Sequence, residues 1–209
     1  MTIQLNPSFN KTDVEILEKD TVYQGHFRMD KYSVRHRLFA GDMSKPLSRE
    51  VFERGHAAAA LLYDPCLDKL VLIEQFRSGL LSSNESPWLL ELVAGIIEAE
   101  ETPEQVIYRE TQEEAGLTVL DLIPLYTYWV SPGGSSERVA LFCARVDATK
   151  AGGIHGLAEE GEDIRVWTFS CKEVYALVAN GRIHNAISII AIQWLQLNEE
   201  KVKQQWLNF

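Results

Sequence analysis

The chain has 209 residues, 46% of them hydrophobic, and a formal net charge of −10. This length allows one packed core with a small appendage, and the apolar content excludes disorder throughout the chain. No apolar run reaches the ~20 residues of a membrane-spanning helix. The acidic charge argues against nucleic acid and anionic membranes as partners.

The N-terminus has no basic stretch followed by an apolar one, so we expect no secretory signal. Cys66, Cys143 and Cys171 stand far apart and form no C-x-x-C pair. They support neither a zinc knuckle nor a thioredoxin motif, and an odd number of scattered thiols favours a cytoplasmic protein. We interpret all three cysteines as packing residues.

The first part of the chain predicts a small β subdomain. Tyr32, Val34, His36 and Leu38 fall at every second position, which is typical of an antiparallel strand. Residues 41–46 form a turn-rich break. We therefore expect an N-terminal β subdomain over residues 1–55 and a second domain over residues 56–209.

The second domain mixes strands and helices without a regular βαβ rhythm, which favours a mixed α/β sandwich over a doubly wound sheet. Asp64 and Pro65 predict a turn after its first apolar stretch. Strands are expected within 56–63, 70–76, 89–93, 117–130, 139–146 and 164–169, and helices over 102–115, 173–178 and 186–197.

The helix over 102–115 is bounded by its own sequence. Thr102 is a good N-cap, Pro103 suits the first helical position, and Gln105 completes a capping box. Gly116 is a natural C-terminal stop. The sequence therefore fixes both ends of this helix.

One face of this helix gathers carboxylates. Glu110 and Glu114 are four residues apart, and Glu113 flanks them. Like charges near a helix C-terminus are unfavourable by themselves, but clustered carboxylates suit a hard divalent cation such as Mg²⁺ or Mn²⁺. The alternative for such a cluster alone is a solvated acidic face.

The stretch from Gly95 to Leu117 reads G-x5-E-x7-R-E-x-x-E-E-x-G-L, which resembles the Nudix box. It departs from the family pattern only at Thr111, where the family prefers an aliphatic residue. The resemblance implies an α/β/α sandwich with a mixed sheet, in which a loop–helix–loop holds catalytic metal ions against a substrate diphosphate.

The resemblance also implies residue roles. Glu110, Glu114 and the Ala94 carbonyl are expected to bind the metal. Arg109 is expected to orient these carboxylates, with Glu113 in the acidic row and Glu101 in a similar orienting role. Gly95 would allow the backbone to approach the metal closely.

A further likeness, over nearly the whole chain, is to bacterial ADP-ribose pyrophosphatases, a branch of this family that also has a proline placed as Pro132 is. The stretches that carry the likeness are Arg35–Phe39, Phe52–Ala57, Pro87–Glu91, His155–Ala158 and Glu162–Val166. Those enzymes are dimers that exchange their N-terminal strands. The likeness implies that both subunits line the substrate, through Phe27 (beside His26), Arg49, Glu50, Arg54, Arg77, Ser131 and Glu137.

The acidic loop 159–163 is the remaining expected site, because the family places its catalytic base there. We predict Glu160 as the base and Glu162 as a metal-contacting carboxylate, with Glu162 and Glu159 as alternative bases. The expected reaction is metal-dependent hydrolysis of ADP-ribose to AMP and ribose 5-phosphate. The alternatives are another nucleotide sugar, such as ADP-glucose or GDP-mannose, and a module that senses ADP-ribose without cutting it.

Overall fold

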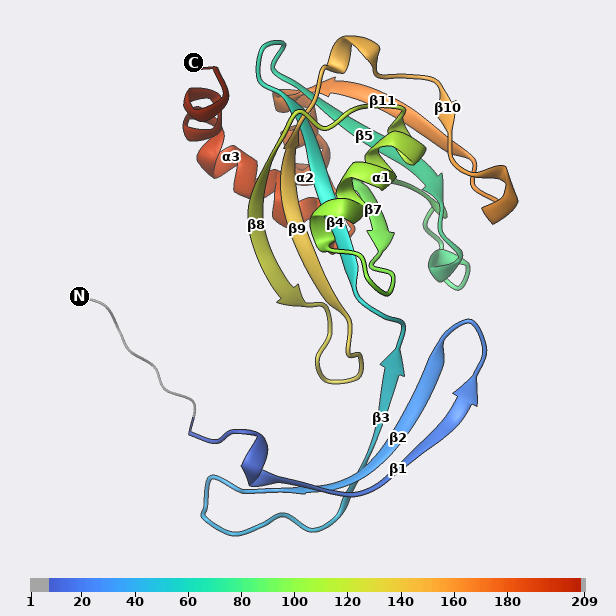
Figure 1. Cartoon of the computed structure of the whole chain (residues 1–209), viewed down its shortest axis with the longest axis vertical. Coiled ribbons are helices and arrows are strands. Elements are labelled where there is room, and N and C mark those ends of the chain that lie inside the picture. Colours follow the sequence, from blue (N-terminus) through green and yellow to red (C-terminus); the bar gives the residue numbers. More distant parts are fainter. Residues whose placement is uncertain (1–7, 208–209) are drawn as a thin grey trace, which may run out of the picture. The chain divides into compact units, whose positions relative to one another are not determined.

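The computed structural model describes residues 8–207 (Figure 1). Its contacts divide the chain into two compact units. Unit 1 comprises the residues up to Gly55 together with Trp129–Glu137, and unit 2 comprises His56–Tyr128 together with the residues from Arg138 onward.

The described part of unit 1 forms an antiparallel sheet in the order β1-β2-β3. The strands are β1 (Val14–Gln24), β2 (Arg28–His36) and β3 (Leu47–Glu53). The loop after β8 joins this unit through Phe52, whose amide donates to Gly134 O at 2.8 Å and whose carbonyl accepts from Ser136 N at 3.2 Å. Among residues 8–207, every buried hydrophobic side chain belongs to unit 2.

Unit 2 is built on a mixed sheet in the order β10-β11-β5-β4-β9-β8, with β6 on β5 and β7 on β4. The central strand β4 runs antiparallel to β5 and β7 and parallel to β9. The strands are β4 (Ala57–Asp64), β5 (Lys69–Phe76), β6 (Trp88–Glu91), β7 (Val93–Ile96), β8 (Asp121–Trp129), β9 (Arg138–Arg145), β10 (Ile154–His155) and β11 (Ile164–Ser170).

Helices cover both faces of this sheet (Figure 1). Alternate residues of β4 enter two separate clusters, because successive side chains of a strand point to opposite faces. Leu61 packs on the side of α2 (Cys171–Ala179) and α3 (Ala186–Leu207), and Leu62 on the side of α1 (Pro103–Ala115). The predicted α/β/α sandwich is confirmed.

Several local predictions differ from the structure in extent. The strand expected over 89–93 is divided between β6 and β7, and α3 extends ten residues past the predicted end at Leu197. Beyond Leu197 only Val202 and Trp206 are buried, so the apolar pattern there is sparse. No helix in the described range 8–207 is long and apolar enough to span a membrane.

The interpretation of Cys66 as a packing residue is wrong, because its side chain is exposed, whereas Cys143 and Cys171 are buried. Cys66 lies in the turn predicted at Asp64. The Asp64 carboxylate accepts from the amides of Cys66 at 2.9 Å and Leu67 at 3.1 Å. The Asp64 side chain stabilises this turn, and the turn places Cys66 at the surface.

Candidate active site

The acidic helix α1 begins and ends where its sequence predicts. Thr102 Oγ1 accepts from Gln105 N at 3.3 Å, and Gln105 Oε1 accepts from Thr102 N at 2.8 Å, so both halves of the capping box form. Gly116 terminates the helix with φ +64°, a left-handed conformation that glycine adopts without strain. The buried residues of the helix are Val106, Ile107, Thr111, Glu114 and Ala115.

The helix packs closely against β7. A Cβ on Gly95 would overlap the carboxylate of Glu110, so only glycine fits there. The buried Glu114 accepts from Ala94 N at 3.0 Å. Ile97 N bonds His56 O, and the alternation of antiparallel pairing then turns the Ala94 amide and carbonyl away from β4, toward the edge where Glu114 lies.

Arg109 gathers the remaining carboxylates. Its Nε and Nη2 donate to the two oxygens of Glu101 at 3.0 and 3.1 Å, and its Nη1 donates to Glu110 at 2.7 Å and Glu113 at 3.1 Å. These partners raise the pKa of Arg109 above its ordinary value, with Glu101 as the largest cause. The paired guanidinium holds three carboxylates in fixed positions.

The carboxylates on the inner face are destabilised as anions. Burial raises the pKa of Glu114 to about 8. The hydrogen bond from the Ala94 amide opposes this rise, and the negative charges of Glu110 and Glu162 add to it. Burial also raises the pKa of Glu110, although Arg109 opposes the shift. Glu110, Glu114 and Glu162 therefore lie within electrostatic reach of one another.

In the described range 8–207, no three His, Cys, Asp or Glu side chains are arranged to hold a metal ion as they stand. Two of the expected ligands are instead turned onto protein donors, Glu110 onto Arg109 and Glu114 onto Ala94 N. The donor set nevertheless fits a divalent cation, because it offers carboxylate oxygens and a backbone carbonyl. Gly95 lets the carboxylate of Glu110 approach the β7 backbone beside Ala94.

The acidic loop is anchored to the end of α1. Gly156 N donates to Glu113 O at 3.1 Å, and the side chain of His155 lies against Gly116. Within the loop, Glu162 accepts from Leu157 N at 3.0 Å and is half-buried. Glu160 is exposed in the short 3₁₀ turn Ala158–Glu160. The structure thus brings Glu162 near the carboxylates of α1 and leaves Glu160 in solvent.

The expected substrate-binding residues, apart from Arg77, lie in unit 1. Three of them form one cluster. The guanidinium of Arg54 lies 5.5 Å from the Phe27 ring centroid, and its Nη1 lies 3.5 Å from Glu137 Oε1. Arg49 and Glu50 are exposed on β3, and Ser131 is exposed in the loop that accompanies Phe52.

Arg77 lies in unit 2, where it has a partner to which the sequence pattern assigned no role. Its Nε donates to Glu91 Oε2 at 2.8 Å, and Gln75 Nε2 donates to the same oxygen at 3.3 Å. The charge of Arg77 also lowers the pKa of Glu114, against the larger effect of burial. Arg77 thus lies within electrostatic reach of the predicted metal ligands.

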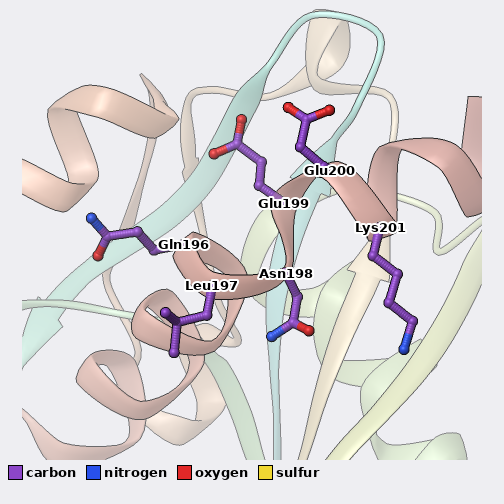
Figure 2. Close-up of a pocket in the computed structure, with 6 residues that line it drawn as sticks. All are labelled: Gln196, Leu197, Asn198, Glu199, Glu200 and Lys201. Atoms are coloured by element: carbon purple, nitrogen blue, oxygen red, sulfur yellow. The ribbon is translucent and has the colours of Figure 1, made fainter.

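A hollow of about 400 Å³ lies beside α3 and is lined only by Gln196–Lys201 (Figure 2). The lining side chains come from one stretch of one helix, and Figure 2 shows them pointing in different directions from it. None of the predicted site residues is among them. This hollow is therefore not a candidate active site.

Residues 53–201 match the family model described as NUDIX domain, and the chain belongs to the Nudix family. Among curated proteins, it is 52% identical over 199 residues to an ADP-ribose pyrophosphatase of Escherichia coli (strain K12), covering 95% of each chain. It is 45% identical to an ADP-ribose pyrophosphatase of Haemophilus influenzae, covering 95% of this chain and 93% of that one.

More distant relatives follow. The chain is 33% identical to a GDP-mannose pyrophosphatase of Pectobacterium atrosepticum, covering 86% of this chain and 92% of that one. A solved structure described as an ADP compounds hydrolase has a TM-score of 0.69 and 20% identity, and covers 95% of this chain and 99% of its own. At that identity, this last likeness concerns the fold alone.

Proposed function

We propose that this protein hydrolyses the diphosphate of ADP-ribose to AMP and ribose 5-phosphate. The observation that carries the proposal is the group of Glu110, Glu114 and Glu162 beside β7, within a chain that matches ADP-ribose pyrophosphatases over 95% of its length. A sensor that binds without cutting has no need of these mutually repelling carboxylates, so their presence favours the enzyme.

Glu110, Glu114, Glu162 and the Ala94 carbonyl would hold a divalent cation, Mg²⁺ or Mn²⁺. When bound, this ion would neutralise the diphosphate and increase the electrophilicity of phosphorus. Arg109 keeps Glu110 oriented through the 2.7 Å hydrogen bond. The positive charge of the bound ion would offset the repulsion between the carboxylates on this face of the helix.

The remaining roles concern the substrate and the proton. Glu160, exposed on its loop between Gly156 and Gly161, would accept the proton of the attacking water, with Glu162 and Glu159 as alternatives. Arg77 would donate to the diphosphate. Phe27 and Arg54 would bind the nucleoside part, and Arg49, Glu50, Ser131 and Glu137 would complete the binding surface.

We also propose that the protein is a homodimer in which unit 1 contributes to the partner's substrate site. Strand β1 is exposed along its whole length and carries Val14, Ile16, Val22 and Tyr23, each 46–64% exposed. Apolar side chains gathered on one exposed element are typical of an interface. A second copy of this chain is the partner that the resemblance implies.

The test is a substrate panel assayed with Mg²⁺, in which phosphate is released from the products by a coupled phosphatase. We expect the highest kcat/KM for ADP-ribose, ahead of ADP-glucose and GDP-mannose. The similarity to a GDP-mannose pyrophosphatase makes GDP-mannose the strongest competing substrate. A higher kcat/KM for GDP-mannose would contradict the proposal, and binding of ADP-ribose without turnover would identify a sensor.

A further inference from the structure

His155 lies where the acidic loop begins, at a position to which the sequence pattern assigns no role. It ends the short strand β10, which pairs with β11 through His155 and Ile164. The intervening loop carries Glu160 and Glu162. His155 therefore stands at the start of the segment that bears the proposed base and a proposed metal ligand.

The ring of His155 is held at two points. Its Nε2 lies 2.8 Å from Gly152 O, and this nitrogen carries the proton, because a carbonyl oxygen can only accept. The ring also lies so close to Gly116 that a Cβ on that glycine would overlap Cε1 of the ring. Because Gly116 ends α1, the ring connects the loop directly to the acidic helix.

The backbone beside His155 makes a second connection to α1. Leu117 N, which a continuing helix would direct to Glu113 O, instead bonds Thr111 O at 3.2 Å. Gly156 N donates to Glu113 O at 3.1 Å in its place. The loop thus supplies the donor that the end of the helix does not.

The same loop holds Glu162 by short local contacts. Gly156 has φ +98°, and a Cβ on it would overlap the Cβ of Glu162. Leu157 N donates to Glu162 Oε2 at 3.0 Å, and Glu162 N donates to Leu157 O at 3.2 Å. A displacement of the chain at His155 would therefore carry Glu162 with it.

Glu162 differs from the other proposed ligands in what determines its position. Glu110 and Glu114 lie on α1, and Ala94 lies on β7, so regular elements position these three. Glu162 lies outside the helices and strands, just before β11. Its position relative to α1 depends on the contacts that His155 and Gly156 make at the start of the loop.

We propose that His155 is a positioning residue for the metal site, which holds the acidic loop on the end of α1 and so places Glu162 beside the carboxylates of that helix. The inference rests on the proposed function, because it assumes that these carboxylates share a divalent cation. His155 is not itself a ligand. It acts through Glu162, as the partners that orient metal ligands do.

The first test measures Mn²⁺ binding to the substrate-free, full-length protein by electron paramagnetic resonance. H155A should raise the Kd about 10-fold, as is typical when a group that orients a metal ligand is removed. H155Q, whose side-chain amide can donate over a similar reach, should restore most of the affinity. H155L, which fills the space without a donor, replaces H155A if the alanine variant does not fold.

The matched control is H184A. His184 Nδ1 lies 3.2 Å from Gly181 O, three residues back in the chain as Gly152 is from His155, but in the segment before α3. H184A should leave the Kd for Mn²⁺ unchanged. If H184A weakened binding as much as H155A, the effect would belong to the stability of the whole domain, and the proposal would be overturned.

The second test asks whether His155 acts through Glu162. In the E162Q background, H155A should not raise the Kd further, because the ligand that His155 positions is already lost. A residue with only a packing role would weaken binding equally in both backgrounds. That result, or an unchanged Kd for H155A alone, would overturn the proposal.

Failure of the proposed function is a separate outcome, seen if the parent protein binds no Mn²⁺. The attachment of the loop is then judged from hydrogen exchange of backbone amides. H155A should speed exchange at Gly156 and Leu157 about 3- to 10-fold, as expected from the loss of one hydrogen bond. Exchange in α2 should stay as it is in the parent. Unchanged exchange at Gly156 and Leu157 would show that His155 does not hold the loop.

Discussion

Unit 1 and unit 2 are stabilised in different ways. Unit 2 buries an apolar cluster on each face of its sheet, whereas the described part of unit 1 contributes no buried hydrophobic side chain. The most deeply buried side chain of unit 1 is instead a charge. Asp30 lies 3.0 Å from both Lys19 and Arg28 and accepts from Thr21 at 2.8 Å. Burial opposes its ionisation, but these partners outweigh that effect and lower its pKa.

This difference matches the division of expected roles. Two of the carboxylates that would hold the metal, Glu110 and Glu114, lie on helix α1 of unit 2, which packs against the core. Most residues expected to bind the nucleotide lie in unit 1, where strand β1 exposes apolar side chains such as Ile16 and Tyr23. Under the proposed function, unit 2 carries out the chemistry, and unit 1 binds the substrate in association with a second chain.

The largest expected effect comes from deleting unit 1. Removing residues 1–40 eliminates β1 and β2 but none of the core clusters of unit 2. The truncated protein should retain the circular dichroism of a folded sandwich while losing both dimerisation and ADP-ribose binding. Sedimentation and calorimetry would measure these losses, and a monomer with full activity would refute the division of roles.

Removing a single charge from unit 2, that of Glu114, should lower activity nearly as much. E114Q keeps the shape and the acceptor for Ala94 N but removes the negative charge of a proposed metal ligand. We expect kcat to fall ~10²-fold or more, as when electrostatic stabilisation of a transition state is lost. The fold should stay intact, because the substitution removes a buried charge. Near-normal turnover in saturating Mg²⁺ would exclude Glu114 as a ligand.

The acidic loop allows a finer distinction. E160Q should lower kcat by about 10²-fold with ADP-ribose and Mg²⁺ affinity unchanged, as expected for a base that acts only in the transition state. E162Q should weaken the Mg²⁺ dependence as well as the rate. A magnesium titration of the steady-state rate compares the two. If E160Q retained full activity while E162Q or E159Q were inactive, the base would lie elsewhere in this loop.

The smallest effect concerns stability. Thr111 is fully buried in unit 2, and its Oγ1 has no hydrogen-bond partner among the described residues. T111V should raise the free energy of unfolding by about 1 kcal/mol, because it removes an unsatisfied polar group. The matched variant T21V in unit 1 removes a hydroxyl that does have a partner, Asp30, and should lower it by about 1 kcal/mol. Urea unfolding measures both, and a destabilised T111V would contradict the assignment of an unpaired hydroxyl.

What the sequence could predict was local. The ends of α1 depend on Thr102, Gln105 and Gly116, all within one or two turns, so the chain alone determines them. The sandwich is consistent with continuous apolar strands such as β4, which is buried on both faces. The sequence does not predict the end of α3, because contacts with residues distant in the chain hold its last turns, such as the 2.8 Å bond from Trp206 Nε1 to Asp121.

The residues of the candidate site likewise differ in whether the local sequence can predict them. The charged pattern on α1 predicts Glu110 and Glu114 as a pair, because helical spacing alone places them on one face. Glu91 carries no such signal, since tertiary packing brings it to Arg77. The loop Trp129–Glu137 joined unit 1 for the same reason, through backbone hydrogen bonds to the distant Phe52.

Subunit complementation tests most directly the claim that unit 2 catalyses while unit 1 of the partner binds. E114Q would be mixed with R54A under conditions that exchange subunits, and the rate measured at ADP-ribose concentrations below KM. In a mixed dimer, intact unit 2 of one chain meets intact unit 1 of the other, so equimolar mixing should restore about a quarter of the wild-type rate. A rate equal to the average of the two parent variants would contradict the account.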